Sequence, residues 1–166
     1  IFPMLIRDWR QQWDNEDLPF FYVQLPAMGR PDWPEFREQQ RGFLGTIDRV
    51  GMAVTIDVGH PTDVHPRNKE PVGERLARLA LAREYGVDII DSGPMIAEAA
   101  RDGTRVRLRF THAGAGLTTR DGEPVTGFEI LDSEGTIHTA SARIESGLVL
   151  LDIDTGKDGL RRRPDL

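Results

Sequence analysis

Two different patterns of apolar and polar residues follow one another along the chain. Up to about residue 100, short apolar runs alternate with stretches in which apolar side chains recur every three or four residues, as they do on one face of a helix. The apolar runs cover Phe20–Leu25 and Met52–Val58, and the helical stretches cover residues 2–13, 33–41 and 69–85. Apolar runs of this kind are typical of strands covered on both faces, so the order predicts an α/β fold with a parallel sheet.

The expected helices carry recognisable capping residues. Asp32 precedes the second helical stretch, with Glu35 three residues further on as in a capping box, and Asn68 precedes the third. In the first helical stretch, Trp9 and Trp13 lie on the apolar face, which predicts that both rings pack in the core.

From about residue 103 the pattern changes to a strict alternation of apolar and polar residues. Val106, Leu108 and Phe110 alternate with three arginines, which predicts a half-buried strand with an arginine-bearing outer face. Turn residues then separate further short strands, at Phe128–Leu131, Thr136–Ile144 and Leu148–Ile153. The sequence therefore predicts a partial α/β domain over residues 1–102, a small antiparallel β extension over residues 103–155 and a tail over residues 156–166.

Composition narrows the classes of function. The chain has 166 residues and a net charge of −6, which disfavours nonspecific nucleic-acid binding, and it has no cysteine, which excludes disulfides, thiolate metal sites and cysteine nucleophiles. No apolar run reaches the length that spans a bilayer. We therefore expect neither a nucleic-acid nor a membrane partner. Because the sequence starts at Ile1 rather than at methionine, we also expect that a leader or a whole segment has been removed.

The densest group of reactive side chains lies directly after the second apolar run, where ligands bind in open α/β sheets. This segment contains Asp57, His60, Asp63 and His65. Histidine acts as a general base near neutral pH, and a carboxylate beside it holds the ring in one tautomer, so Asp63 and His65 form a candidate catalytic pair. Two alternatives stay open: His65 has a local role such as capping the next helix, or the four side chains bind zinc or manganese.

Three blocks in the same region resemble a known family. They are Gly51–Gly59 (GMAVTIDVG), Asp63–Lys69 (DVHPRNK) and Val72–Ala77 (VGERLA). In this order and spacing they are similar to the C-terminal catalytic block of sialate O-acetylesterases, which belong to the SGNH-hydrolase group of esterases. Shorter matches extend the resemblance to about residues 1–150, among them Phe2–Ile6, Phe21–Leu25, Trp33–Glu35 and Ser92–Pro94.

The resemblance implies the C-terminal part of a flavodoxin-like three-layer sheet, and hydrolysis of acetyl esters on sugar hydroxyls, notably of O-acetylated sialic acids. It makes His65 the general base and Asp63 the acid that orients it. Many SGNH enzymes place the acid three residues before the histidine; that position is Thr62 here, so Asp57 is the alternative acid. His60 lies where relatives often carry an acidic residue, so it should not be essential. The family implies no metal or organic cofactor and suggests an extracytoplasmic location (secreted, periplasmic or lysosomal).

The nucleophile of such an esterase is missing from these residues. In the family a serine follows the first strand of the sheet, and a glycine and an asparagine from later loops bind the oxyanion; none of these blocks occurs here. None of the serines lies in a strand–turn–helix context, and they are Ser92, which fits a turn, Ser133, Ser141 and Ser146. We expect the missing N-terminal part of the same protein, or another chain, to complete the sheet, and the isolated chain to be inactive or nearly so. The alternative is a non-catalytic carbohydrate-binding or assembly module built on an esterase scaffold.

An O-acetylated sugar or sialoglycan substrate would need polar side chains near the histidine. Gln24, at the end of the first apolar run, and Arg37 and Gln40, on the helix after it, are the candidates. The alternative is that these three side chains hydrogen-bond neighbouring loops. Trp9 and Trp13 offer faces on which sugars can stack, but their place on the apolar face of a helix favours core packing.

Overall fold

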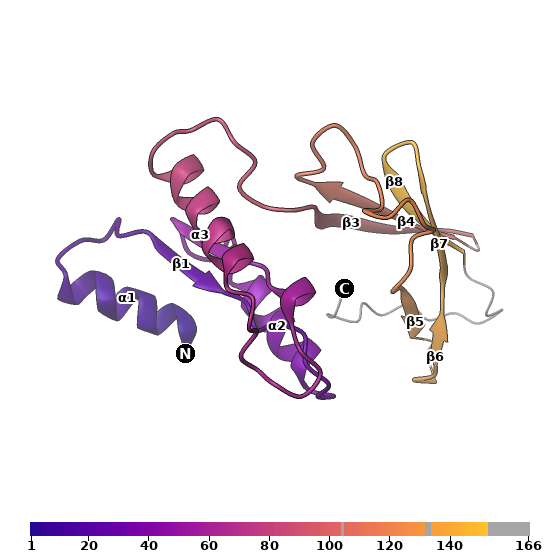
Figure 1. Cartoon of the computed structure of the whole chain (residues 1–166), viewed down its shortest axis with the longest axis horizontal. Helices are drawn as coiled ribbons and strands as arrows, with labels where there is room; N and C mark the ends of the chain where they lie inside the picture. Colours follow the sequence, from indigo (N-terminus) through magenta and orange to yellow (C-terminus); the bar gives the residue numbers. More distant parts are fainter. Residues whose placement is uncertain (104, 132–133, 153–166) are drawn as a thin grey trace. The chain divides into compact units, whose positions relative to one another are not determined.

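The computed structural model describes residues 1–103, 105–131 and 134–152, and it divides into two compact units, one of residues 1–92 and one that begins at Gly93. Figure 1 shows the order of the elements. The first unit contains α1 (Phe2–Gln12), β1 (Phe20–Val23), α2 (Trp33–Gly42), β2 (Val50–Ala53), the short 3₁₀ helix η1 (Ile56–Val58) and α3 (Glu70–Arg83). Among the described helices, none has the length and apolar content needed to cross a membrane.

The first unit is built on two parallel strands, β1 and β2, with Phe20 opposite Val50 and α2 as the connection between them. Tyr22 and Met52 share one face of this pair and form a buried cluster with Ile6 of α1. Successive side chains of a strand point to opposite faces, so Gly51, which lies against Leu79 of α3, marks the other face. Helices α1 and α3 therefore cover opposite faces of the pair (Figure 1), which confirms the mixed α/β fold.

The second strand is shorter than the sequence predicted. The apolar run Met52–Val58 leaves the sheet after Ala53 and turns through η1. The Thr55 hydroxyl, which is fully buried, donates a hydrogen bond of 2.6 Å to the Gln24 carbonyl and so closes the end of the strand pair. Val54, the next residue after β2, is exposed and does not continue the ladder.

The prediction that Trp9 and Trp13 pack in the core is wrong. They are 46% and 67% exposed, and the Trp9 ring meets the Phe20 ring of β1 edge to face, at 6.2 Å between ring centroids. The buried side of α1 is centred on Ile6 instead, which is fully buried against the strand pair together with the partly buried Phe2. At the C-terminal end of the helix, Trp13 is left largely exposed.

The helices α2 and α3 begin and end close to the predicted positions, but their caps differ from expectation. Asp32 precedes α2 without a side-chain capping hydrogen bond. Asn68 does accept a hydrogen bond of 3.3 Å from the Glu70 backbone, although Lys69 is the residue that directly precedes α3. The predicted buried face of α3 is present, with Leu79 its most buried member.

The second unit is antiparallel. One sheet has the strand order β3-β4-β8-β7, and a second pairs β5 with β6. The strands are β3 (Met95–Asp102), β4 (Arg105–Thr111), β5 (Glu129–Leu131), β6 (Ile137–Thr139), β7 (Ser141–Glu145) and β8 (Leu148–Asp152). The turn between β7 and β8 consists of Ser146 and Gly147, both with positive φ, as the twist of a two-residue hairpin requires.

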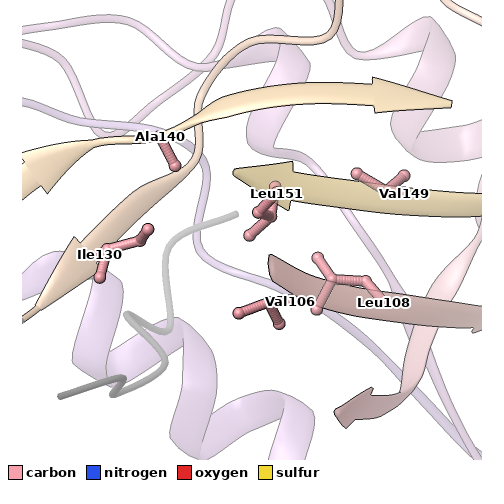
Figure 2. Close-up of a cluster of buried hydrophobic side chains, with 6 residues drawn as sticks. All are labelled: Val106, Leu108, Ile130, Ala140, Val149 and Leu151. Carbon is pink, nitrogen blue, oxygen red and sulfur yellow. The ribbon is translucent and has the colours of Figure 1, made fainter. Parts of the chain in front are cut away.

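A single apolar core holds the described part of the second unit together. Figure 2 shows its side chains, which come from β4, β5 and β8 and from the residue between β6 and β7: Val106, Leu108, Ile130, Ala140, Val149 and Leu151. The alternation predicted for residues 105–110 is confirmed, since Val106 and Leu108 are buried and the intervening arginines are exposed. Those arginines pair with carboxylates of neighbouring strands; Arg105 lies 3.0 Å from Asp152, for example.

Two boundaries in this region differ from the sequence-based ones. The α/β domain was expected to reach residue 102, but Met95–Asp102 forms β3 and pairs along its length with β4. The expected strand Thr136–Ile144 is divided at Ala140, whose backbone N–H bonds the Phe128 carbonyl as the chain passes from one sheet to the other. The predicted tail, residues 156–166, and the last residue of the strand expected to end at Ile153 lie outside the described residues.

Candidate active site

The loops that follow β1 and β2 lie together at the carboxyl edge of the strand pair. The His60 backbone N–H donates to the Ala27 carbonyl at 3.1 Å, and the Gly29 N–H donates to the Pro61 carbonyl at 2.9 Å. Gly59 makes this approach possible, because a Cβ at its position would lie 2.2 Å from the Ala27 oxygen. The chain after β2 is therefore fastened to the chain after β1 shortly before it reaches Asp63 and His65.

Asp63 and His65, the predicted catalytic pair, are in direct contact. The Asp63 Oδ1 accepts the His65 backbone N–H at 2.9 Å and lies 3.2 Å from the ring Nδ1. The His65 side chain is 84% exposed, so the ring is reachable from solvent. The His65 backbone N–H holds the pKa of the Asp63 carboxyl below its usual range, with smaller contributions from the ring. This arrangement can orient an imidazole for proton transfer through its Nε2.

Asp57, the alternative acid, is engaged elsewhere. Its two carboxylate oxygens each accept a hydrogen bond of 2.6 Å from Arg75 of α3. That bidentate pairing raises the pKa of the Arg75 guanidinium above its usual value. The structure thus brings Asp63, and not Asp57, to the His65 ring among the contacts it describes. The Arg75 contact was not predicted, since its partner lies 18 residues away and no local pattern signals it.

The arrangement does not favour the metal-binding alternative. Over residues 1–152, apart from the three positions that are not described, no group of three or more histidine or acidic side chains is placed to hold a metal ion. His60 turns its Nδ1 toward the Thr62 backbone N–H, at 3.3 Å, and Asp57 is held by Arg75. Asp57 and His60, two of the proposed joint ligands, therefore have partners outside the proposed set.

The three polar residues suggested for substrate binding make contacts within the fold. Gln24 is buried and donates its side-chain N–H to the Arg37 carbonyl at 3.2 Å. The Gln40 Oε1 accepts the Leu25 backbone N–H at 2.8 Å. The Arg37 side chain is itself buried. These contacts tie β1 to α2, and a role in binding substrate stays a prediction.

No nucleophile accompanies the histidine in the part of the chain that the structure describes. There, no serine hydroxyl is hydrogen-bonded to His65. Two surface hollows lie elsewhere in the first unit, one of about 340 Å³ beside Arg10 and Arg49 and one beside Ile1 and Met4, and neither is lined by His65. The described residues thus bring Asp63 to the His65 ring, and their roles as acid and base stay a prediction.

Comparison with solved structures gives this geometry a context. The chain matches the crystal structure of XAC1771, described as a novel carbohydrate acetylesterase from Xanthomonas citri, with a TM-score of 0.87 and 35% sequence identity. The chain is similar to a carbohydrate acetylesterase. The match covers 96% of this chain but 38% of that acetylesterase, so the chain spans well under half of its length. No protein-family model matches the sequence, and no curated protein does.

The similarity to the acetylesterase extends through both units, because it covers nearly all of the chain. It is therefore not confined to the first unit, which holds β1, β2 and the loop with His65. An acetylesterase as a neighbour agrees with the type of chemistry expected from the Asp63–His65 pair.

Proposed function

We propose that this chain is part of a carbohydrate O-acetylesterase that resembles the sialate O-acetylesterases and hydrolyses acetyl esters on sugar hydroxyls. The observation that supports it most is the likeness to a carbohydrate acetylesterase over 96% of the chain at 35% identity. The contact between Asp63 and the His65 ring supplies the matching chemistry. On this proposal the first unit is the C-terminal part of a flavodoxin-like SGNH-hydrolase domain.

The reaction proceeds by acyl transfer to a serine. The His65 Nε2 takes the serine proton as the hydroxyl oxygen attacks the acetyl carbon, and the imidazolium then gives that proton to the departing sugar oxygen. Asp63 stabilises the imidazolium through Nδ1. Water, activated by the same ring, releases acetate and restores the serine.

The serine and the oxyanion donors come from outside these residues. Two observations support this part of the proposal: the chain spans 38% of the acetylesterase it resembles, and a two-stranded sheet leaves one edge of each strand open within the described unit. The missing N-terminal part of the same protein, or another chain, would add strands to β1 and β2 and bring the nucleophile to His65. The substrate is then an O-acetylated sugar or sialoglycan.

The test compares two proteins in one assay of acetate release from an O-acetylated sialoglycan and from an acetylated neutral oligosaccharide. One protein is the isolated 166-residue chain, and the other is the full-length polypeptide that carries it. We expect turnover from the full-length protein only, and loss of it in His65→Ala. Turnover by the isolated chain would contradict an external serine. An inactive full-length protein that still binds glycans would favour the alternative of a non-catalytic carbohydrate-binding module.

A further inference from the structure

The loop between β2 and α3 is the segment that presents His65. Residues 54–69 carry the Asp63–His65 pair, and much of this loop is exposed. Beyond Pro61 the described hydrogen bonds of the loop are local, such as the bond from the His65 N–H to Asp63. The described hydrogen bonds that tie the loop to the rest of the unit lie in its first half, while in its second half Pro66 is buried. One set joins it to the loop after β1, through His60 and Pro61.

A second set joins the loop to α3 through a single guanidinium. Arg75 donates to both oxygens of Asp57 at 2.6 Å and, with one of the same nitrogens, to the Val54 carbonyl at 2.7 Å. The end of β2, the η1 turn and α3 therefore meet at one side chain. The planar fork of arginine matches a carboxylate in a way that the single ammonium of lysine does not.

The same helix contains a matched arrangement that does not involve the loop. Arg83 donates to the Val50 carbonyl at 2.8 Å and to Asp91 at 2.6 Å. Both arginines thus bind one carbonyl of the β2 region and one aspartate, and both are about one-third exposed. They differ in the segment that the aspartate belongs to: Asp57 lies in the loop that carries His65, whereas Asp91 follows α3.

We propose that Arg75 is a positioning residue for the esterase reaction, acting through Asp57 to fix the loop that presents Asp63 and His65. The inference rests on the proposed function of that pair. Asp57 lies on one side of the close approach at Gly59, and the catalytic pair lies on the other. With Asp57 released, the η1 turn keeps the Thr55 bond to Gln24 but loses its tie to α3. The chain that enters the Gly59 contact then shifts, and the His65 ring moves relative to the serine.

The test uses the full-length protein with four variants, Arg75→Gln, Arg75→Lys, Asp57→Asn and the control Arg83→Gln. Displacing a catalytic group by about 1 Å costs on the order of 100-fold in rate. We therefore expect kcat to fall about 10- to 100-fold in both Arg75 variants and in Asp57→Asn, with KM changed less than about threefold. Arg75→Lys should recover little of the lost kcat, because the single ammonium of lysine does not match both carboxylate oxygens. Arg83→Gln should keep kcat within about twofold of the parent.

Thermal unfolding of each variant separates positioning from stability, because Arg83→Gln removes a comparable set of contacts from the same helix. A kcat for Arg75→Gln and Asp57→Asn no lower than that of Arg83→Gln would overturn the proposal. If Arg75→Gln fails to fold, the near-isosteric Asp57→Asn decides. His65→Ala is assayed alongside: its inactivity with a fully active Arg75→Gln rejects the positioning role alone, whereas full activity of His65→Ala rejects the esterase assignment together with it.

Discussion

The Asp63 carboxylate meets His65 twice through one oxygen, which accepts the backbone N–H at 2.9 Å and lies 3.2 Å from the ring Nδ1. An aspartate that bonds the backbone two residues ahead is held by the turn itself. The backbone hydrogen bond therefore orients the carboxylate independently of its contact with the ring. This explains how a ring that is 84% exposed can still have a defined partner.

Removing the ring should nearly abolish acetate release. In the full-length protein, His65→Ala should lower kcat/KM by about 10²–10⁴-fold, the usual contribution of a general base. Asp63→Asn keeps the turn-forming oxygen but loses its charge, so its effect should be large and smaller than that of His65→Ala. Initial rates on an O-acetylated sugar measure both. A matched control is His112→Asn in the second unit, where φ is 55° and asparagine suits the left-handed backbone; a comparable loss there would count against a specific role for His65.

The Asp63 carboxyl should titrate below the usual range for aspartate. The largest cause is the His65 backbone N–H, which bonds the ionised form. Because the folded-state pKa is lowered, the stabilisation is present above the unfolded-state pKa and is lost as the pH falls through the folded-state value. NMR titration of the Asp63 carboxyl carbon tests this. His65→Ala keeps the backbone donor, so most of the lowering should survive in it; a return to the ordinary value would assign the effect to the ring.

Substituting Gly59 should disturb the junction of the two loops. A Cβ there would lie 2.2 Å from the Ala27 oxygen, and both partners are backbone, so Gly59→Ala should destabilise the fold by about 1–3 kcal/mol. Gly73, in the exposed part of α3, has no atom within 4 Å of the same position, so Gly73→Ala should stabilise by about 0.5–1 kcal/mol. Urea unfolding of both variants distinguishes them. Equal urea midpoints for Gly59→Ala and Gly73→Ala would show that the two loops can move apart at little cost in stability.

Tyr22 should ionise late and make stability depend on alkaline pH. Burial raises its pKa to about 12, and its hydroxyl donates to the Gln40 carbonyl at 2.5 Å. An unfolded tyrosine ionises near pH 10, so the free energy of unfolding should decrease between about pH 10 and 12. Tyr22→Phe should flatten this decrease and cost about 1 kcal/mol at neutral pH. Urea unfolding at pH 8 and pH 11 measures both effects, and an unchanged slope in Tyr22→Phe would assign it to other groups.

The sequence predicted the elements whose local pattern agrees with their final surroundings. The alternation of Val106 and Leu108 with arginines, and the buried face of α3 around Leu79, are of this kind. Prediction from the sequence failed where the structure of a segment depends on partners far away along the chain. Met95–Asp102 has no regular alternation and becomes a strand only by pairing with β4. Trp13 lies on an apolar helix face but meets no second layer among the described residues, so its ring stays exposed.

For the site, the contact that could be predicted from the sequence is the one between residues close together along the chain. Asp63 and His65 are two residues apart, so a loop alone can bring them together, and the structure does so. Arg75 and Asp57 come from a helix and a turn whose meeting depends on how α3 packs on the strand pair. No pattern within either segment indicates that contact. For the same reason the sequence alone did not decide whether Gln24 and Gln40 bind a sugar or make hydrogen bonds within the fold; in the structure they make such hydrogen bonds.

The turn of Ser146 and Gly147 bears on how fast each half of the molecule acquires its structure. Strands β7 and β8 adjoin along the chain, so this hairpin can close by itself, within about 1–10 μs. Strands β1 and β2 meet only after the whole α2 connection has been ordered, and long-range parallel pairing is slow. During refolding, the antiparallel half should therefore acquire protected amides earlier than the half that holds the histidine.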